Sequence, residues 1–227
     1  MRAMFNNIAR NYDFLNHFLS FGIDIIWRKR LIRELKKFKP DIVLDMATGT
    51  GDLAIMASGA GVPKTIGIDL SNEMIAVGLG KIEHRKLNEK VELLVGDAEN
   101  IEFENNYFDA AMVAFGVRNF EDLQKGLSEI NRVLKPLQPL FVLEFSKPRI
   151  FPVKQFYQFY SFKLLPLIGR MISKDPRAYQ YLPESIQAFP SGNEFLEVMR
   201  SCNFANCRQI PLSFRIATLY IGQKKCE

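Results

Sequence analysis

The sequence predicts an α/β fold, a doubly wound, Rossmann-like domain with a mostly parallel sheet of seven strands. Short apolar segments alternate with helical segments from residue 41 onward, which is the pattern of repeated βαβ units. The first apolar segment runs into a glycine-rich turn, DMATGTGD, and then into a helical run. A strand that enters a helix through such a turn typically holds a nucleotide-like ligand. The 227 residues are enough for one such domain with a full core.

The expected elements divide a single domain, residues 1–227, into three parts. A helical amino-terminal extension over residues 1–39 precedes the sheet, and a helical insertion over residues 150–190 separates its fifth strand from the last two. Pro136 ends the helix before the fifth strand, because proline cannot continue a helix. The strands are expected at residues 41–46, 65–70, 91–98, 108–117, 140–145, 208–212 and 214–222.

The composition is that of an ordinary globular protein, with 48% hydrophobic and 24% charged residues. The sequence shows no signal peptide, and no uncharged apolar run approaches the roughly 18 residues that a spanning helix needs. We therefore expect a cytoplasmic protein whose contact with the inner face of a membrane is at most peripheral. The three cysteines form no C-x-x-C pair, which predicts reduced thiols and no metal site.

The positive net charge of +5 is concentrated in the segment WRKRLIRELKKFK, residues 27–39. Its apolar residues recur at helical spacing, which predicts an amphipathic helix. Two interpretations follow. The helix packs on the core and leaves a solvated basic face, or the basic face attracts anionic lipid, where each nearby basic residue contributes about 1 kcal/mol.

Three acidic residues follow the first three predicted strands. Asp45, Asp69 and Asp97 are therefore expected at the same edge of the sheet, where the carboxyl ends of parallel strands meet. Asp69 is placed to accept both hydroxyls of a ribose, and Asp97 to reach an adenine amino group beside the backbone N–H of Ala98. Gly49 and Gly51 let the backbone of the turn approach the ligand closely; together these residues predict an adenosine-containing cofactor.

Two cofactors compete for this site, because GTGDLA also fits the dinucleotide-binding pattern of nicotinamide enzymes. A pyrophosphate would have to lie at the helix amino terminus, where Asp52 repels it, and Asp45 adds a second negative charge nearby. S-adenosylmethionine carries no phosphate, and its ammonium and sulfonium groups favour carboxylates. The charges therefore favour S-adenosylmethionine over NAD. A third interpretation is that the glycines only form a tight turn.

Several segments resemble, in chain order, the motifs of the quinone-ring C-methyltransferases of ubiquinone and menaquinone biosynthesis. They are DMATGTGD, GIDLS, GDAENI, FDAAMVAFGVRNFED, NRVLKP and LEFSKP. MFNNIARNYDFLNHFLSFGIDIIWR resembles the amino-terminal signature of this family, and YQYLPESIQAFP its late substrate-side signature, so nearly the whole chain is covered. The resemblance implies a methyltransferase sheet, S-adenosylmethionine as methyl donor, a prenylated quinol as acceptor, and cofactor contacts at Thr50, Asp69, Asp97 and Ala98.

The sequence departs from the family pattern at two places. Leu137, Gln138 and Pro139 stand where the family usually has two glycines, and Pro139 lacks a backbone donor, so this turn must differ. Ala114 occupies a position that is often serine in the relatives that make ubiquinone, which favours demethylmenaquinol as the acceptor.

Carbon methylation of a quinol needs a neighbouring hydroxyl to lose its proton, and that hydroxyl has a pKa of about 10 like tyrosine. Three residues are candidates for this step. Arg118, just after the fourth strand, would stabilise a phenolate, or instead pair with Glu121 or Asp122. His17 has a pKa suited to a base but is also a candidate structural residue, and Tyr12 would bond the quinol oxygen or pack as an aromatic.

The segment 151–172 is rich in aromatic residues and is not required by a cofactor-binding core. One interpretation is a mobile apolar lid over the quinol, bending near Pro166 and Gly169, and the other is ordinary core packing. Rival functions are a methyltransferase of the ubiquinone pathway or of another hydrophobic small molecule, and a degenerate methyltransferase fold that binds membrane or RNA. The basic helix has its aromatics on its apolar stripe, which speaks against nucleic acid. The sequence is compatible with a homo-oligomer.

Overall fold

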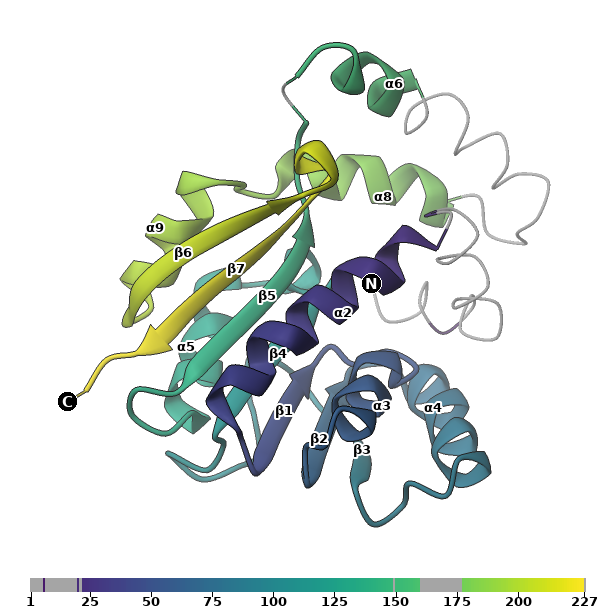
Figure 1. Cartoon of the computed structure of the whole chain (residues 1–227), viewed down its shortest axis with the longest axis vertical. Helices are drawn as coiled ribbons and strands as arrows, with labels where there is room; N and C mark the ends of the chain where they lie inside the picture. Colours follow the sequence, from purple (N-terminus) through teal and green to yellow (C-terminus); the bar gives the residue numbers. More distant parts are fainter. Residues whose placement is uncertain (1–5, 7–19, 21, 149, 160–176, 227) are drawn as a thin grey trace.

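The computed structural model describes residues 6, 20, 22–148, 150–159 and 177–226. Its centre is a seven-stranded sheet with the order β3-β2-β1-β4-β5-β7-β6 (Figure 1). The first five strands run parallel, and β7 pairs antiparallel with both β5 and β6. The predicted fold class is confirmed. The strands are β1 (Ile42–Met46), β2 (Lys64–Asp69), β3 (Val91–Val95), β4 (Ala110–Ala114), β5 (Pro139–Phe145), β6 (Phe204–Leu212) and β7 (Ala217–Lys224).

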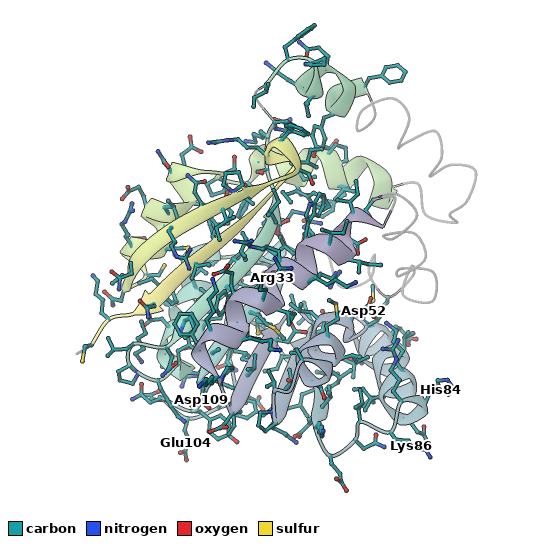
Figure 2. All side chains as sticks on the ribbon, viewed as in Figure 1. Arg33, Asp52, His84, Lys86, Glu104 and Asp109 are labelled. Atoms are coloured by element: carbon teal, nitrogen blue, oxygen red, sulfur yellow. The ribbon has the colours of Figure 1, made fainter. Side chains whose placement is uncertain are left out.

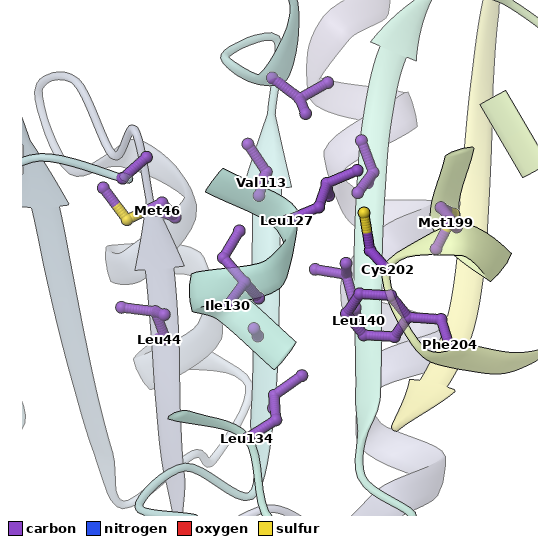
Figure 3. Packing of buried hydrophobic residues seen from close by; sticks show 14 of the residues in the cluster. Leu44, Met46, Val113, Leu127, Ile130, Leu134, Leu140, Met199, Cys202 and Phe204 are labelled. Carbon is purple, nitrogen blue, oxygen red and sulfur yellow. The ribbon is translucent and has the colours of Figure 1, made fainter. Parts of the chain in front are cut away.

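Helices cover both faces of this sheet. Those on one face are α2 (Ile23–Leu35), α3 (Asp52–Gly59) and α4 (Asn72–His84); those on the other are α5 (Leu123–Val133) and α9 (Asn193–Ser201). The strands read as nearly continuous apolar runs because both faces are buried. Figure 3 shows Leu127 and Ile130 of α5 packed with Met199 and Phe204 over the strands.

The helix α2 confirms the amphipathic pattern. Trp27, Leu31 and Leu35 are buried against the sheet, while most of the basic side chains are exposed, Arg33 among them (Figure 2). Glu34, the acid of this basic stretch, is buried and lies 2.7 Å from the Nζ of Lys37 and 3.1 Å from a guanidinium nitrogen of Arg30. Part of the positive charge of the helix is thereby neutralised within the fold.

The turn before β5 is formed by Leu137, Gln138 and Pro139, the residues expected to replace a glycine pair. Leu137 takes a left-handed conformation, with φ 64°, and its side chain is exposed. Its N–H donates to the carbonyl of Lys224 at 3.1 Å, which ties the turn to the last strand. Pro139 is the first residue of β5, a position at which a missing N–H is tolerated. The turn lies at the amino end of β5, away from the carboxyl edge of the sheet.

Two further helices flank the carboxyl edge of β5. They are α6 (Val153–Phe159) and α8 (Arg177–Ala188), both inside the range predicted as a helical insertion. Pro166 and Gly169, the predicted bend of the lid, lie outside the described residues, as does most of the range 1–21. Among the helices that the structure describes, none has the length and apolar character needed to cross a membrane.

Candidate cofactor site at the carboxyl edge of the sheet

The turn after β1 depends on its glycines. Gly49 and Gly51 have φ values of 58° and 78°, in the left-handed region that favours glycine. A Cβ on Gly51 would also lie 3.2 Å from a methyl carbon of Leu93. The N–H of Gly51 closes the turn on the carbonyl of Thr48 at 3.0 Å, and α3 begins at the next residue. The sequence DMATGTGD thus forms the sharp strand–helix turn that it predicts.

Asp69, the last residue of β2, holds this turn from the neighbouring strand. One carboxylate oxygen accepts the N–H of Gly49 at 2.8 Å and the other accepts the N–H of Ser71 at 2.9 Å. Burial raises the pKa of Asp69, and the two N–H groups act against that rise. Both oxygens retain further lone pairs, so the carboxylate is a pre-oriented acceptor for a pair of hydroxyl groups.

A cavity opens along this edge, beside Asp69. Of the predicted cofactor residues, Gly49, Asp69, Asp97 and Ala98 line it. Its walls come from the ends of the first four strands and the residues that follow them: Met46, Ala47, Gly49, Asp69, Leu70, Ser71, Met74, Gly96, Asp97, Ala98, Glu99, Ala114, Phe115, Gly116, Asn119, Phe120 and Glu121. Asp97 is exposed and accepts the N–H of Glu99 at 2.9 Å, whereas Ala98 is buried. The predicted adenosine-binding residues lie together.

Asp45 is not among the lining residues, although the sequence places it at the same edge. Its side chain is buried behind the turn and accepts the hydroxyl of Thr48 at 2.6 Å. Burial raises the pKa of Asp45 to about 7, while the hydroxyl of Thr48 and the charge of Arg28 oppose the rise. In this structure the carboxyl group of Asp45 therefore stabilises the turn through Thr48 and does not line the cavity.

Replacing Asp45 with asparagine is expected to remove a pH-dependent contribution to stability. Because the pKa of Asp45 is raised from 3.8 to about 7, the folded protein retains a proton that the unfolded chain has released. This contribution is present at low pH and is lost as the pH rises from 3.8 to about 7. The free energy of unfolding of Asp45→Asn relative to the native protein should therefore increase between about pH 5 and about pH 8 in urea titrations. An equal difference at both pH values would contradict the raised pKa.

The amino terminus of α3 carries less net negative charge than the sequence predicts. Asp52 (labelled in Figure 2) forms an ion pair with Lys81 of α4, with 2.6 Å between carboxylate oxygen and Nζ. The same Nζ donates to the hydroxyl of Thr50 at 2.8 Å, and Thr50 is buried outside the cavity wall. Lys81 partly offsets the repulsion expected between Asp52 and a pyrophosphate, so the charge at this helix end disfavours NAD less than the sequence predicts.

Arg118 is paired with an acid other than the two that the sequence indicates. Its guanidinium lies 2.8 Å from a carboxylate oxygen of Glu144, at the end of β5, and also donates to the carbonyl of Phe115 and the hydroxyl of Ser185. Both side chains of the ion pair are buried, and burial raises the pKa of Glu144 while Arg118 opposes the rise. Arg118 therefore joins β5 to α8 behind the cavity wall.

Asn119, the neighbour of Arg118, lines the cavity and is absent from the residues predicted as functional. The hydroxyl of Tyr181, from α8, donates to its side-chain oxygen at 2.9 Å. This contact joins the segments FDAAMVAFGVRNFED and YQYLPESIQAFP across the fold. Both segments resemble motifs of the same family, and that resemblance is the sequence signal for Asn119. The side-chain amide nitrogen of Asn119 remains a donor for a ligand.

The other two candidates for proton transfer, His17 and Tyr12, lie outside the described residues. His84, at the end of α4, is exposed and lies away from the cavity (Figure 2). Within the described ranges, no group of three or more histidine, cysteine and acidic side chains is arranged to hold a metal ion.

Comparisons with known proteins identify close relatives. The model of the ubiE/COQ5 methyltransferase family matches residues 1–224. A demethylmenaquinone methyltransferase of Bacteroides fragilis is 46% identical, over 99% of this chain and 92% of the relative. One from Porphyromonas gingivalis is 44% identical, with the same coverage. A ubiquinone/menaquinone biosynthesis C-methyltransferase UbiE of Geotalea daltonii is 41% identical, over 99% of this chain and 96% of the relative.

Solved structures show the same fold at low sequence identity. A putative S-adenosyl-L-methionine-dependent methyltransferase of Methanococcus maripaludis has a TM-score of 0.69 and 19% identity, covering 98% of this chain and 94% of the other. A SAM-dependent methyltransferase of Aquifex aeolicus has a TM-score of 0.62 and 20% identity, with coverage of 84% and 87%.

Proposed function

This chain belongs to the ubiE/COQ5 methyltransferase family, and on that basis we propose that it transfers a methyl group from S-adenosylmethionine to a ring carbon of demethylmenaquinol, giving menaquinol. The enzyme class follows from the family. The acceptor is inferred from the relatives named demethylmenaquinone methyltransferase, which are more similar to this chain than the Geotalea UbiE relative. Ala114, which lines the cavity in place of the serine common in ubiquinone-making relatives, supports the same acceptor.

The observation that best supports this proposal is the position of Asp69. Its carboxylate is held by two backbone N–H groups at the cavity wall, 2.8 and 2.9 Å from its oxygens, and this orientation would let it accept the hydroxyls of a ribose. Asp97 and Ala98 extend the same wall toward an adenine. The residues present therefore fit an adenosyl group, whose sulfonium supplies an already activated methyl when S-adenosylmethionine is bound.

The remaining task of the protein is to align the quinol and to handle its proton. Alignment alone contributes roughly 7–11 kcal/mol to such reactions. Arg118, His17 and Tyr12 are the proposed participants in proton handling. Asn119 joins them, because its amide nitrogen can donate to a quinol oxygen while Tyr181 fixes the orientation of the amide. The Arg118–Glu144 ion pair is close to neutral overall, which points to a positioning role for Arg118.

A methylation assay tests the proposed reaction. Purified protein with S-adenosylmethionine and liposomes containing demethylmenaquinol should yield menaquinol, identified by mass. A second set of liposomes with the ubiquinone precursor measures the rival acceptor. S-adenosylmethionine binding without methylation of either quinol would favour the degenerate binding protein instead.

The proposed acceptor is dissolved in a bilayer, and apolar side chains are exposed at the carboxyl edge of the sheet. Phe151 and Phe159, beside and within α6, are 77% and 58% exposed, and Phe214, in the turn between β6 and β7, is 69% exposed. Core packing does not account for these three side chains. With the basic face of α2, they support the proposed peripheral contact with an anionic membrane.

Serine replacements of Phe151 and Phe159 test this contact. We expect the double variant to bind S-adenosylmethionine normally but to sediment less with anionic liposomes and to methylate liposomal demethylmenaquinol more slowly. The reason is the lost burial of apolar surface in the bilayer, about 1.5–3 kcal/mol for each fully buried ring. Serine at the exposed Tyr107, on the opposite edge of the sheet, is the matched control. Unchanged sedimentation and turnover would contradict a role of α6 in membrane contact.

A further inference from the structure

Arg28 of α2 is a buried cation whose guanidinium makes a long ion pair with Asp24 but no hydrogen bond to any residue that the structure describes. The residue is 9% exposed, and its Nε is enclosed without a partner. Its nearest carboxylate oxygen, on Asp24, lies 3.6 Å from that nitrogen, which is too far for a hydrogen bond. No hydrogen bond of its guanidinium is found among the described residues. The neighbouring Arg30 also has an unpaired Nε, but its terminal nitrogen lies 3.1 Å from Glu34.

A buried guanidinium without good partners is unfavourable, because it loses its hydrogen bonds to water and few protein groups replace them. Such a group is retained more readily where a ligand completes its interactions. A carboxylate is the natural complement, since its two oxygens match the fork of N–H donors on arginine. Arg28 therefore indicates an anionic ligand group, provided that it stands beside a cavity.

Arg28 is not itself among the residues that line the cofactor cavity, but it lies next to one that does. Its guanidinium carbon lies 5.5 Å from the ring centre of Phe115, and Phe115 lines the cavity just after β4. Its charge also acts on Asp45, directly before the glycine turn of β1. The ribose and adenine positions at Asp69 and Asp97 belong to the other end of the cavity, beyond β2 and β3.

S-adenosylmethionine bound with its ribose at Asp69 and its adenine at Asp97 must extend its methionine portion toward β1 and β4. That portion ends in a carboxylate. We propose that Arg28 binds this carboxylate, an inference that rests on the proposed function only through the identity of the cofactor. The glycine turn then contributes backbone N–H groups, and Arg28 contributes the full positive charge opposite the carboxylate. The same contact would hold the product S-adenosylhomocysteine.

The test compares ligands with and without the carboxylate by calorimetry, so it does not depend on turnover. The native protein should bind S-adenosylmethionine roughly 10- to 100-fold more tightly than decarboxylated S-adenosylmethionine, which keeps the sulfonium and the ammonium. In Arg28→Gln this preference should disappear: affinity for S-adenosylmethionine falls by that factor while affinity for the decarboxylated form is unchanged. Arg28→Lys should restore part of the preference. Arg30→Gln, on the same helix, is the matched control and should keep it.

Three results would overturn the proposal. They are an undiminished preference in Arg28→Gln, an equal loss for both ligands, and a native protein that binds both ligands equally. Arg28→Met keeps the length and apolar stem of the side chain above Phe115, and it serves as the second variant if glutamine impairs folding. A native protein that binds neither ligand would instead contradict the proposed function itself.

Discussion

Asp69→Ala is expected to weaken S-adenosylmethionine binding by roughly 2–4 kcal/mol, which is about a 30- to 1,000-fold loss of affinity. The carboxylate is held by the N–H groups of Gly49 and Ser71 and faces the cavity, so its removal deletes an acceptor for both ribose hydroxyls. The substitution also leaves those two N–H groups without their partner. Isothermal titration calorimetry measures the loss directly.

Glu92→Ala is the matched control for this experiment. Glu92 lies on the adjacent strand β3, and its ion pair with Lys64 is at the surface, at the opposite end of the strands. Removing it should leave S-adenosylmethionine affinity unchanged. If Asp69→Ala binds the cofactor as tightly as Glu92→Ala does, the assignment of Asp69 to the ribose is wrong.

Glu144→Ala is expected to lower the free energy of unfolding by about 3–5 kcal/mol, the usual consequence of removing one partner from a buried ion pair. Glu144 is fully buried, and its carboxylate accepts from the guanidinium of Arg118 and from the N–H of Phe145 at 2.8 Å each. Without it, the positive charge of Arg118 remains in the interior with only neutral acceptors. Urea unfolding followed by circular dichroism measures the change.

A double variant separates the structural role of Arg118 from a role in the reaction. Replacing Arg118 and Glu144 together with methionine removes both charges, and buried pairs replaced in this way often lose little stability. We expect the double variant to be more stable than Glu144→Ala. If Arg118 positions Asn119 and the quinol, the double variant should turn over more slowly than the native protein while its affinity for S-adenosylmethionine is preserved. Full turnover in the stable double variant would remove Arg118 from the mechanism.

The fold and the adenosine end of the site could be predicted because their signals are local in the sequence. The strands are short apolar runs, and the acids of the site follow them at fixed offsets, so the parallel order brings Asp69 and Asp97 to one edge. The turn of Gly49 and Gly51 likewise depends on backbone conformation at consecutive residues. Periodicity and turn chemistry were sufficient for these features.

The charge partners could not be predicted, because they depend on which side chains meet across the fold. Arg118 pairs with Glu144, which is 26 positions away on β5, and not with the nearby Glu121 or Asp122. Lys81 reaches Asp52 from a different helix, and burial changes Asp45 from a presumed anion into a group that titrates at about pH 7. Desolvation and pairing at long range decide the electrostatics of this site, and neither is visible in the spacing of residues.

The packing of α2 against the sheet makes Trp27 an intrinsic fluorescent probe of this region. Trp27 is the only tryptophan of the chain, and its ring lies 6.1 Å from that of Phe115 and 6.2 Å from that of Phe145. Its indole N–H donates to the hydroxyl of Ser213, in the turn between β6 and β7, at 2.9 Å. Fluorescence from this single chromophore therefore arises where α2, the cavity wall and that turn meet. Ligand entry beside Phe115 and detachment of α2 from the sheet can both be followed without an added label.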